Sequence, residues 1–188
     1  MDPKIAFELL QKYVKGETLL RHCKTVGVTM RYFAEKYGEN ADYWESIGIL
    51  HDIDFEVAPD NHCTKCVEIF KTEKANYAWI DDKIIHAVHS HGWNITVDIK
   101  PEHKMEKVLY TVDELTGLIF ACAMARPSKS VSDMEVKSVT KKFKALNFAA
   151  GCNREVIKVG AQLMEEELND VIQDCILAMR AKHEELGC

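Results

Sequence analysis

Apolar residues recur at helical spacing along almost the whole of this 188-residue chain. They stand three and four positions apart, which places them on one face of an α-helix. No segment alternates apolar and polar residues for long enough to require a β-strand. The pattern therefore predicts an all-α fold, and the length predicts a single domain over residues 1–188.

Breaks and capping residues delimit the predicted helices. Gly38 is the expected residue just past a helix end, Asn40 can cap the next helix, and Ser132 with Glu135 has capping-box spacing. Gly48 would let another helix approach closely. We expect a core over about 18–125, on which C-terminal helices over 132–186 pack. The predicted helices cover residues 4–14, 18–37, 40–52, 61–72, 79–91, 102–125 and 132–143, with two more after a turn at 151–153.

Composition limits the class of function. The net charge is -6 and the pI is about 5.8, which argues against a duplex nucleic-acid partner, because phosphate contacts are built from clustered lysine and arginine. We find no secretory signal and no apolar run of membrane-spanning length, so we expect a cytoplasmic protein without a membrane partner. The seven cysteines are scattered and odd in number, which favours reduced thiols over a disulfide framework.

Six residues with metal-binding side chains follow one another in the order H, HD, H, H, D. His22 and His91 continue the apolar stripes of their helices, whereas His86 and His89 lie off the stripe. Asp113 falls among apolar residues, where a cation would relieve the desolvation cost of a lone carboxylate. A single inward histidine is more often a hydrogen-bonded core residue, so the metal prediction depends on the whole set. That set is His22, His51, Asp52, His62, His91 and Asp113.

In this order, His22, the His51-Asp52 pair and Asp113 resemble the H...HD...D signature of the HD-domain superfamily of metal-dependent phosphohydrolases. His62 and His91 extend the resemblance toward the branch with two further histidines. The chain looks most similar to small predicted HD hydrolases of bacterial type. The resemblance covers roughly residues 18–165 and implies a helical bundle of the HD-domain type.

The resemblance also implies one or two divalent cations. Mixed imidazole and carboxylate ligation suits iron, manganese or zinc better than calcium. Asp52 would be the catalytic residue, because a carboxylate can bridge two cations, and cations about 3.5 to 4 Å apart can share an activated hydroxide. The short connection from Asp52 to His62 leaves occupancy by one cation open. The implied ligands are His22, His51, Asp52 and Asp113 for the first cation, and His62 and His91, with Asp52 as the bridge, for the second.

Residues outside the ligand set suggest a phosphate site. Arg126, Ser128 and Lys129 precede a predicted helix, and cationic and hydroxyl groups at a helix N-terminus can receive a phosphate. The alternative interpretation is an exposed serine-rich turn that caps this helix. Lys65, one helical turn after His62, could reach a phosphate oxygen or could be an ordinary surface charge.

Two further motifs receive no role. Cys63 and Cys66 form a CxxC pair, but a structural zinc site would lack its other ligands, so we expect buried or idle thiols. Aromatic residues could stack on a base, although at helical spacing they are usually core residues, and Trp93 is the best exception. The aromatic candidates are Trp44, Phe55, Trp79 and Trp93.

The first functional hypothesis is therefore a metal-dependent phosphohydrolase. It would cleave a phosphoester or phosphoanhydride of a small phosphorylated substrate, such as a nucleotide, through a metal-activated hydroxide. A second hypothesis is a di-iron oxygenase, since some HD relatives use the same two-metal scaffold in that way. A third is a non-catalytic protein that binds metal or nucleotide for regulation.

Overall fold

The computed structural model describes residues 1–188 and contains helices and loops, with one isolated bridge between Trp93 and Val97. The prediction of an all-α fold is confirmed. None of the helices combines the length and the apolar character needed to cross a membrane. The elements are α1 (Pro3–Tyr13), α2 (Glu17–Tyr37), α3 (Ala41–Leu50), the 3-10 helix η1 (Pro59–Asn61), α4 (Lys65–Glu73), α5 (Asp82–Ser90), α6 (Lys104–Met124), α7 (Val136–Phe143), α8 (Arg154–Met164), α9 (Leu168–Ala181) and α10 (His183–Leu186).

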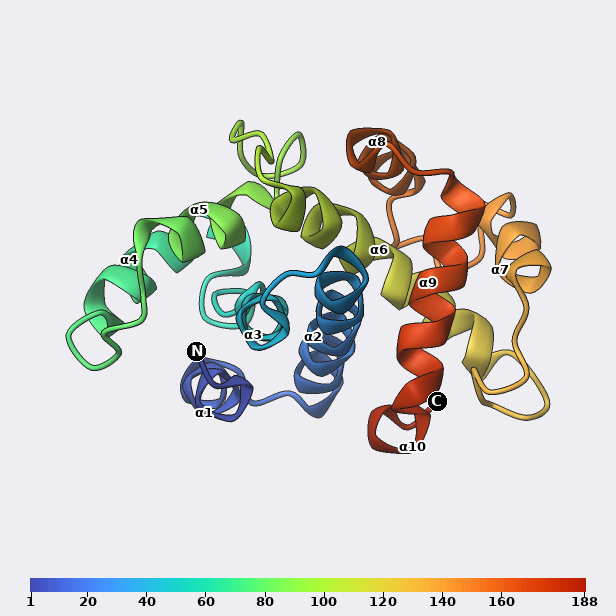
Figure 1. The fold of residues 1–188 in the computed structure, drawn as a ribbon, viewed down its shortest axis with the longest axis horizontal. Coiled ribbons are helices and arrows are strands. Elements are labelled where there is room, and N and C mark those ends of the chain that lie inside the picture. The colour runs from blue at the N-terminus through green and yellow to red at the C-terminus, as the bar shows by residue number, and fades with distance from the viewer.

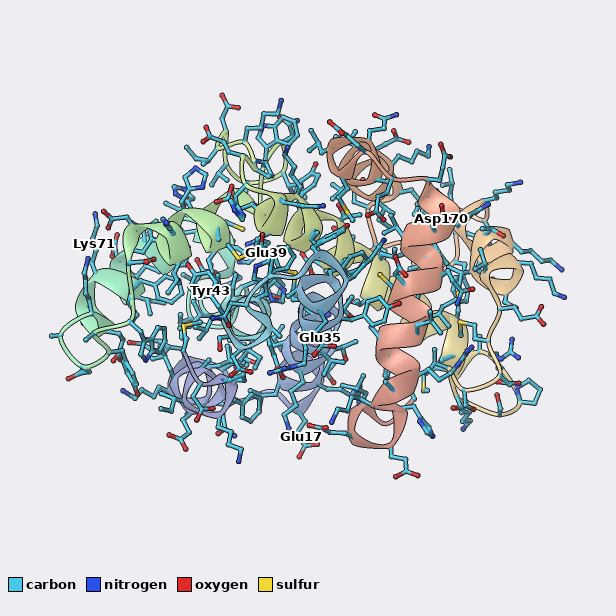
Figure 2. All side chains as sticks on the ribbon, viewed as in Figure 1. Glu17, Glu35, Glu39, Tyr43, Lys71 and Asp170 are labelled. Carbon is cyan, nitrogen blue, oxygen red and sulfur yellow. The ribbon has the colours of Figure 1, made fainter.

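The helices share one core. A single hydrophobic cluster of 44 buried residues takes members from α1 through α10, so the C-terminal helices are not a separate unit. The long helix α6 contacts α2 and α5 as well as α7, α8 and α9, and α9 also packs on α2 (Figure 1). Charged side chains such as Lys71 and Asp170 project from the surface (Figure 2).

Capping residues act where the sequence predicts them around α3. Gly38 ends α2 with a φ of 72°, a left-handed conformation that glycine adopts without steric cost. The side chain of Asn40 then accepts a hydrogen bond from the backbone N–H of Tyr43 at 3.0 Å and starts α3. A short connection thus turns the chain back, and α3 packs along α2.

Glycines allow α2 and α3 to approach closely. A Cβ added at Gly48 would lie 2.8 Å from Cα of Gly27 and 2.9 Å from Cγ of Met30, which is closer than real Cβ atoms come to other atoms. The prediction that Gly48 lets another helix approach is confirmed. This contact matters for the site, because α2 carries His22 and α3 ends next to His51.

Some predicted helix boundaries were wrong, above all between α3 and α4. Helix α3 ends at Leu50, and Asp52 lies in the turn that follows. His62 does not begin a helix, because it lies in a turn after η1 and α4 starts only at Lys65. The left-handed φ of 65° at Cys63 interrupts the helical path at this point. The helical spacing of apolar residues could not reveal this turn.

Two later helices also start further along the chain than predicted. Helix α5 begins at Asp82, because the side chain of Asp81 accepts a hydrogen bond from the N–H of Ile84 at 2.9 Å and caps it there. The predicted capping box at Ser132 does not form. Its backbone N–H binds the Ser130 hydroxyl instead, and α7 begins only after Glu135.

Candidate metal centre

Five segments bring the six predicted ligands together. They come from α2, from the residues directly after α3, from the turn before α4, from the residue after α5 and from the middle of α6. Five of the six line a cavity of about 790 Å³, and the sixth, His51, is fully buried behind them. In chain order these predicted ligands are His22, His51, Asp52, His62, His91 and Asp113.

A first group of donor atoms gathers at Oδ2 of Asp52. Nε2 of His51 lies 3.3 Å and Nε2 of His22 lies 3.8 Å from this oxygen. The two nitrogens are 3.2 Å apart. Oδ1 of Asp113 lies 2.9 Å from Nε2 of His22 and 3.3 Å from Nε2 of His51. Ligands bound to one cation at about 2.0 to 2.2 Å stand roughly 3.0 to 3.6 Å apart. The separations of 2.9 to 3.8 Å lie in this range or within about 0.2 Å of it, so small shifts would bring the atoms to a shared cation.

A second group gathers at the other oxygen of the same carboxylate. Oδ1 of Asp52 lies 3.3 Å from Nε2 of His62 and 3.6 Å from Nε2 of His91. These nitrogens are 3.3 Å apart. Because its two oxygens face different groups, Asp52 has the geometry of a bridging ligand. The short connection from Asp52 does not keep His62 away, since η1 and the following turn fold it back.

Hydrogen bonds behind two imidazoles direct their lone pairs inward. Nδ1 of His51 lies 2.7 Å from the carbonyl oxygen of Gly48, and Nδ1 of His91 lies 2.5 Å from that of Val88. A carbonyl oxygen only accepts, so each Nδ1 carries a hydrogen, and in the neutral ring that binds a metal Nε2 presents its lone pair to the centre. Metal-binding histidines are typically held in this way.

Asp54 orients a third imidazole and was not predicted to do so. It is fully buried, and its Oδ1 lies 2.8 Å from Nδ1 of His62. Its Oδ2 accepts a hydrogen bond from the backbone N–H of Cys66 at 2.7 Å, which fixes the carboxylate on the start of α4. Its position two residues after Asp52 was the only sequence signal for this role.

The carboxylates of the site are held in their ionised form. Burial alone would raise the pKa of Asp52, but before a cation binds the charge and hydrogen bond of protonated His51 and a hydrogen bond from His91 hold it well below its ordinary value. Burial would likewise raise the pKa of Asp113, and the same imidazole of His51 together with His22 lowers it instead. Buried, ionised carboxylates beside inward-facing lone pairs form a donor set that fits divalent cations.

The rest of the cavity offers one cationic side chain and an apolar rim. Arg21 is the single lysine or arginine in the lining, and its guanidinium lies 4.6 Å from the centre of the Phe120 ring. Phe55 is 46% exposed and packs its ring 5.0 Å from that of His62, and the nearby Ile95 is 52% exposed. Sequence reasoning missed Arg21, which lies on α2 directly before a predicted ligand.

Among the aromatic candidates, Phe55 lines the cavity, whereas the favoured Trp93 does not. Trp44 is a core residue, and Trp93 packs against Tyr110 with ring centres 5.7 Å apart and does not line the cavity. Phe55 is the candidate that does line it. Its exposure at the rim could not be seen from helical spacing, because it belongs to the turn after α3.

The residues predicted to bind phosphate lie outside this lining. Arg126 binds Asp133 through Nη2 and Oδ2 at 2.6 Å, and the Ser128 hydroxyl donates to the same carboxylate at 3.0 Å. Lys129 is exposed, and Lys65 pairs with Glu68 on the surface of α4. None of the four predicted residues lines the cavity. Their contact with substrate stays a prediction.

Cys63 is buried, as expected, but it is not remote from the site. Its Sγ lies 3.4 Å from Nε2 of His91, and the residue lines the cavity. The other thiol of the CxxC pair, Cys66, points away and donates to the carbonyl oxygen of Cys63 at 2.9 Å. The two cysteines therefore do not act as a pair.

Comparison with known proteins agrees with this geometry. The family model of the HD domain matches residues 19–118, which is more than half of the chain and includes all six predicted ligands. No curated protein and no solved structure gave a match. Because this model matches more than half of the chain, the chain belongs to the HD domain family.

Proposed function

We propose that this protein is a metal-dependent phosphohydrolase that cleaves a phosphoester or phosphoanhydride of a small molecule. The observation that carries the proposal is the placement of Asp52, whose two oxygens face two groups of donor atoms at the wall of an open cavity. Divalent cations bound there would supply an activated water near neutral pH and would neutralise charge on the phosphoryl group.

The chain's own residues would fix the reacting geometry. Asp52 would hold the two groups at a constant spacing, and the backbone carbonyls behind His51 and His91 would keep both imidazoles in the ligand tautomer. Imidazole with carboxylate ligation suits iron, manganese or zinc. We therefore expect one of these metals at the site.

The charge of the cavity supports an anionic substrate that binds together with metal. Apart from Asp52 and Asp113, its lining includes Glu56 and Glu114, against the single cation of Arg21. These carboxylates oppose a phosphate, and bound divalent cations would offset their charge. With them, Arg21 is free to contact a phosphate oxygen, because its guanidinium rests on an aromatic ring rather than on a carboxylate.

The rim supports a substrate that also carries an apolar or aromatic part. Phe55 and Ile95 are about half exposed there, although large apolar side chains are usually buried. A nucleoside base could stack on the Phe55 ring, which the imidazole of His62 holds from one side. A nucleotide therefore heads the list of substrates to test.

The test is turnover of a panel of phosphoesters and nucleotides by protein loaded with iron, manganese or zinc. We expect metal-dependent release of phosphate or nucleoside, and we expect Asp52→Ala to abolish it. His89→Ala is the matched control, because this histidine lies on α5 but does not line the cavity. Failure of all metal-loaded forms to turn over any member of a broad panel would count against the proposal.

The position of Asp52 between two donor groups also favours testing the oxygenase hypothesis. Two cations that share Asp52 would lie close enough to be coupled, as di-iron oxygen chemistry requires. Elemental analysis of anaerobically purified protein and an oxygen electrode distinguish the cases. Two iron atoms per chain with substrate-dependent oxygen consumption would favour an oxygenase. Tight retention of a nucleotide without turnover would favour a regulatory role.

A further inference from the structure

The second group of donor atoms contains a sulfur in addition to imidazole and carboxylate. Sγ of Cys63 lies 3.4 Å from Nε2 of His91, and these two atoms and a ring nitrogen of His62 all lie within 4.8 Å of one another. The Cys63 side chain is fully buried, yet the residue lines the cavity. The sulfur thus belongs to the wall of the centre.

The backbone is arranged to bring two successive side chains to one point. Cys63 has a φ of 65°, a left-handed conformation that residues with a Cβ rarely adopt. This sharp turn lets His62 and Cys63, neighbours in the chain, both face the second group. Residues held in such conformations gather at functional sites, where surrounding contacts maintain them.

The neighbouring helix end leaves room for this sulfur. A Cβ added at Gly92 would lie 2.5 Å from Sγ and 2.9 Å from Cβ of Cys63, so only glycine allows the thiol to reach its place beside His91. Gly92 directly follows His91, so this close fit lies next to a predicted ligand. The position of the sulfur is therefore determined by both the turn before α4 and the end of α5.

When both imidazoles are neutral, as metal ligands are, hydrogens are too few for the acceptor atoms that meet here. The Nδ1 hydrogen of His91 is directed to the carbonyl of Val88, and Nδ1 of His62 faces the Asp54 carboxylate, so both Nε2 atoms turn lone pairs toward the group. Oδ1 of Asp52 is also an acceptor. The thiol of Cys63 could supply a single hydrogen to one of these three acceptor atoms. One cation would bind the three acceptors and the sulfur together.

We propose that Cys63 is a ligand of the second cation and gives this group two nitrogens, one oxygen and one sulfur. As the metal–sulfur bond forms, the thiol proton passes to solvent. Bonds of about 2.3 Å to sulfur and 2.0 Å to nitrogen in a tetrahedral site put these atoms about 3.5 Å apart, close to the separation found. The soft sulfur favours zinc or iron over manganese or magnesium at this position.

The proposal rests on the metal centre of the proposed function but not on the reaction. Its test is addition of Co²⁺ to the metal-free full-length protein. We expect a near-ultraviolet thiolate-to-cobalt charge-transfer band in the unmodified protein, and its loss in Cys63→Ser together with at least about tenfold weaker binding of one cobalt equivalent. Cys152→Ser is the matched control, because this half-buried thiol lines the same cavity outside either donor group and should leave the band unchanged.

A measurement without any variant guards against a folding defect. X-ray absorption of the zinc-loaded protein should show a sulfur scatterer, averaged over two zinc ions per chain. A wild-type spectrum with nitrogen and oxygen scatterers alone, or a cobalt band that survives in Cys63→Ser, would overturn the assignment. Sulfur ligation without hydrolysis would refute only the proposed function, and hydrolysis without sulfur ligation would refute only this inference.

Discussion

Substitution of Gly48 by alanine tests whether the packing of α2 on α3 sets the spacing of the first donor group. The added Cβ would lie 2.8 Å from Cα of Gly27 and 2.9 Å from Cγ of Met30, whereas ordinary contacts begin at 3.4 Å. The methionine can rotate away, but the backbone of Gly27 cannot. The helices must therefore separate by about 0.6 Å where they cross, as overpacked elements do.

The cost can be worked out from opposing terms. Overpacking of this kind costs about 1 to 3 kcal/mol. Alanine in place of glycine returns up to about 1 kcal/mol of helix propensity. Because the obstructing atom of Gly27 is backbone, the upper part of the overpacking range, about 2 to 3 kcal/mol, applies, and about 1 to 2 kcal/mol remains as the net loss. This corresponds to a fall in Tm of roughly 2 to 8 °C for a domain of this size.

The same displacement should reach the metal ligands. His51 follows Gly48 by three residues, and Nε2 of its ring lies 3.2 Å from that of His22 on the opposite helix. A separation of this contact by a few tenths of an ångström moves the two nitrogens away from a common cation. We expect at least about tenfold weaker binding at the first group, because misplaced ligands typically cost that much.

Thermal unfolding in a chelator measures the stability, and cobalt titration measures the affinity. Val139→Ala is the matched control, since it shortens a fully buried side chain of the core on α7, a helix that carries none of the donor residues. Both variants should lose stability, but only Gly48→Ala should lose affinity for metal. A Gly48→Ala protein that unfolds and titrates like the unmodified one would refute the reasoning.

Two further substitutions probe other parts of the molecule. Arg21→Gln should lower kcat/KM by about 10- to 100-fold, because a charge-assisted contact with the substrate phosphate is worth about 1.5 to 3 kcal/mol. Elemental analysis should show unchanged metal content. An unaltered kcat/KM would exclude this contact. Burial alone would raise the pKa of Glu73, but hydrogen bonds, first from Tyr13 and also from Lys12, hold it below its ordinary value. Such a carboxylate adds stability that is present above its unfolded pKa and is lost as the pH falls through the folded one. Glu73→Gln should therefore cost about 1 to 3 kcal/mol in urea unfolding at neutral pH and progressively less below about pH 4, and an equal loss at both would contradict this role.

Local patterns in the sequence were sufficient to predict the fold class and to pick out six side chains that the structure brings together. Helical spacing of apolar residues predicted the all-α fold, since it depends only on which side of each helix is buried. The same spacing selected His91 over His86 and His89, and in the structure His86 faces Glu106 at 2.8 Å while neither lines the cavity. Caps such as Asn40 were also predictable, because a cap acts within a few residues.

Only the tertiary structure decided how these residues combine. The partition of donor atoms between the two oxygens of Asp52 depends on where helices distant in sequence cross, and no local spacing records this. Arg126 has the chemistry of a phosphate ligand, yet its place in the fold ties it to Asp133, whereas Arg21 faces the cavity. Cys63 reaches the cavity wall through its own left-handed backbone conformation in a turn. Periodicity reports the burial of a face, but convergence of side chains depends on the packing of whole helices, which is set by contacts far apart in the chain.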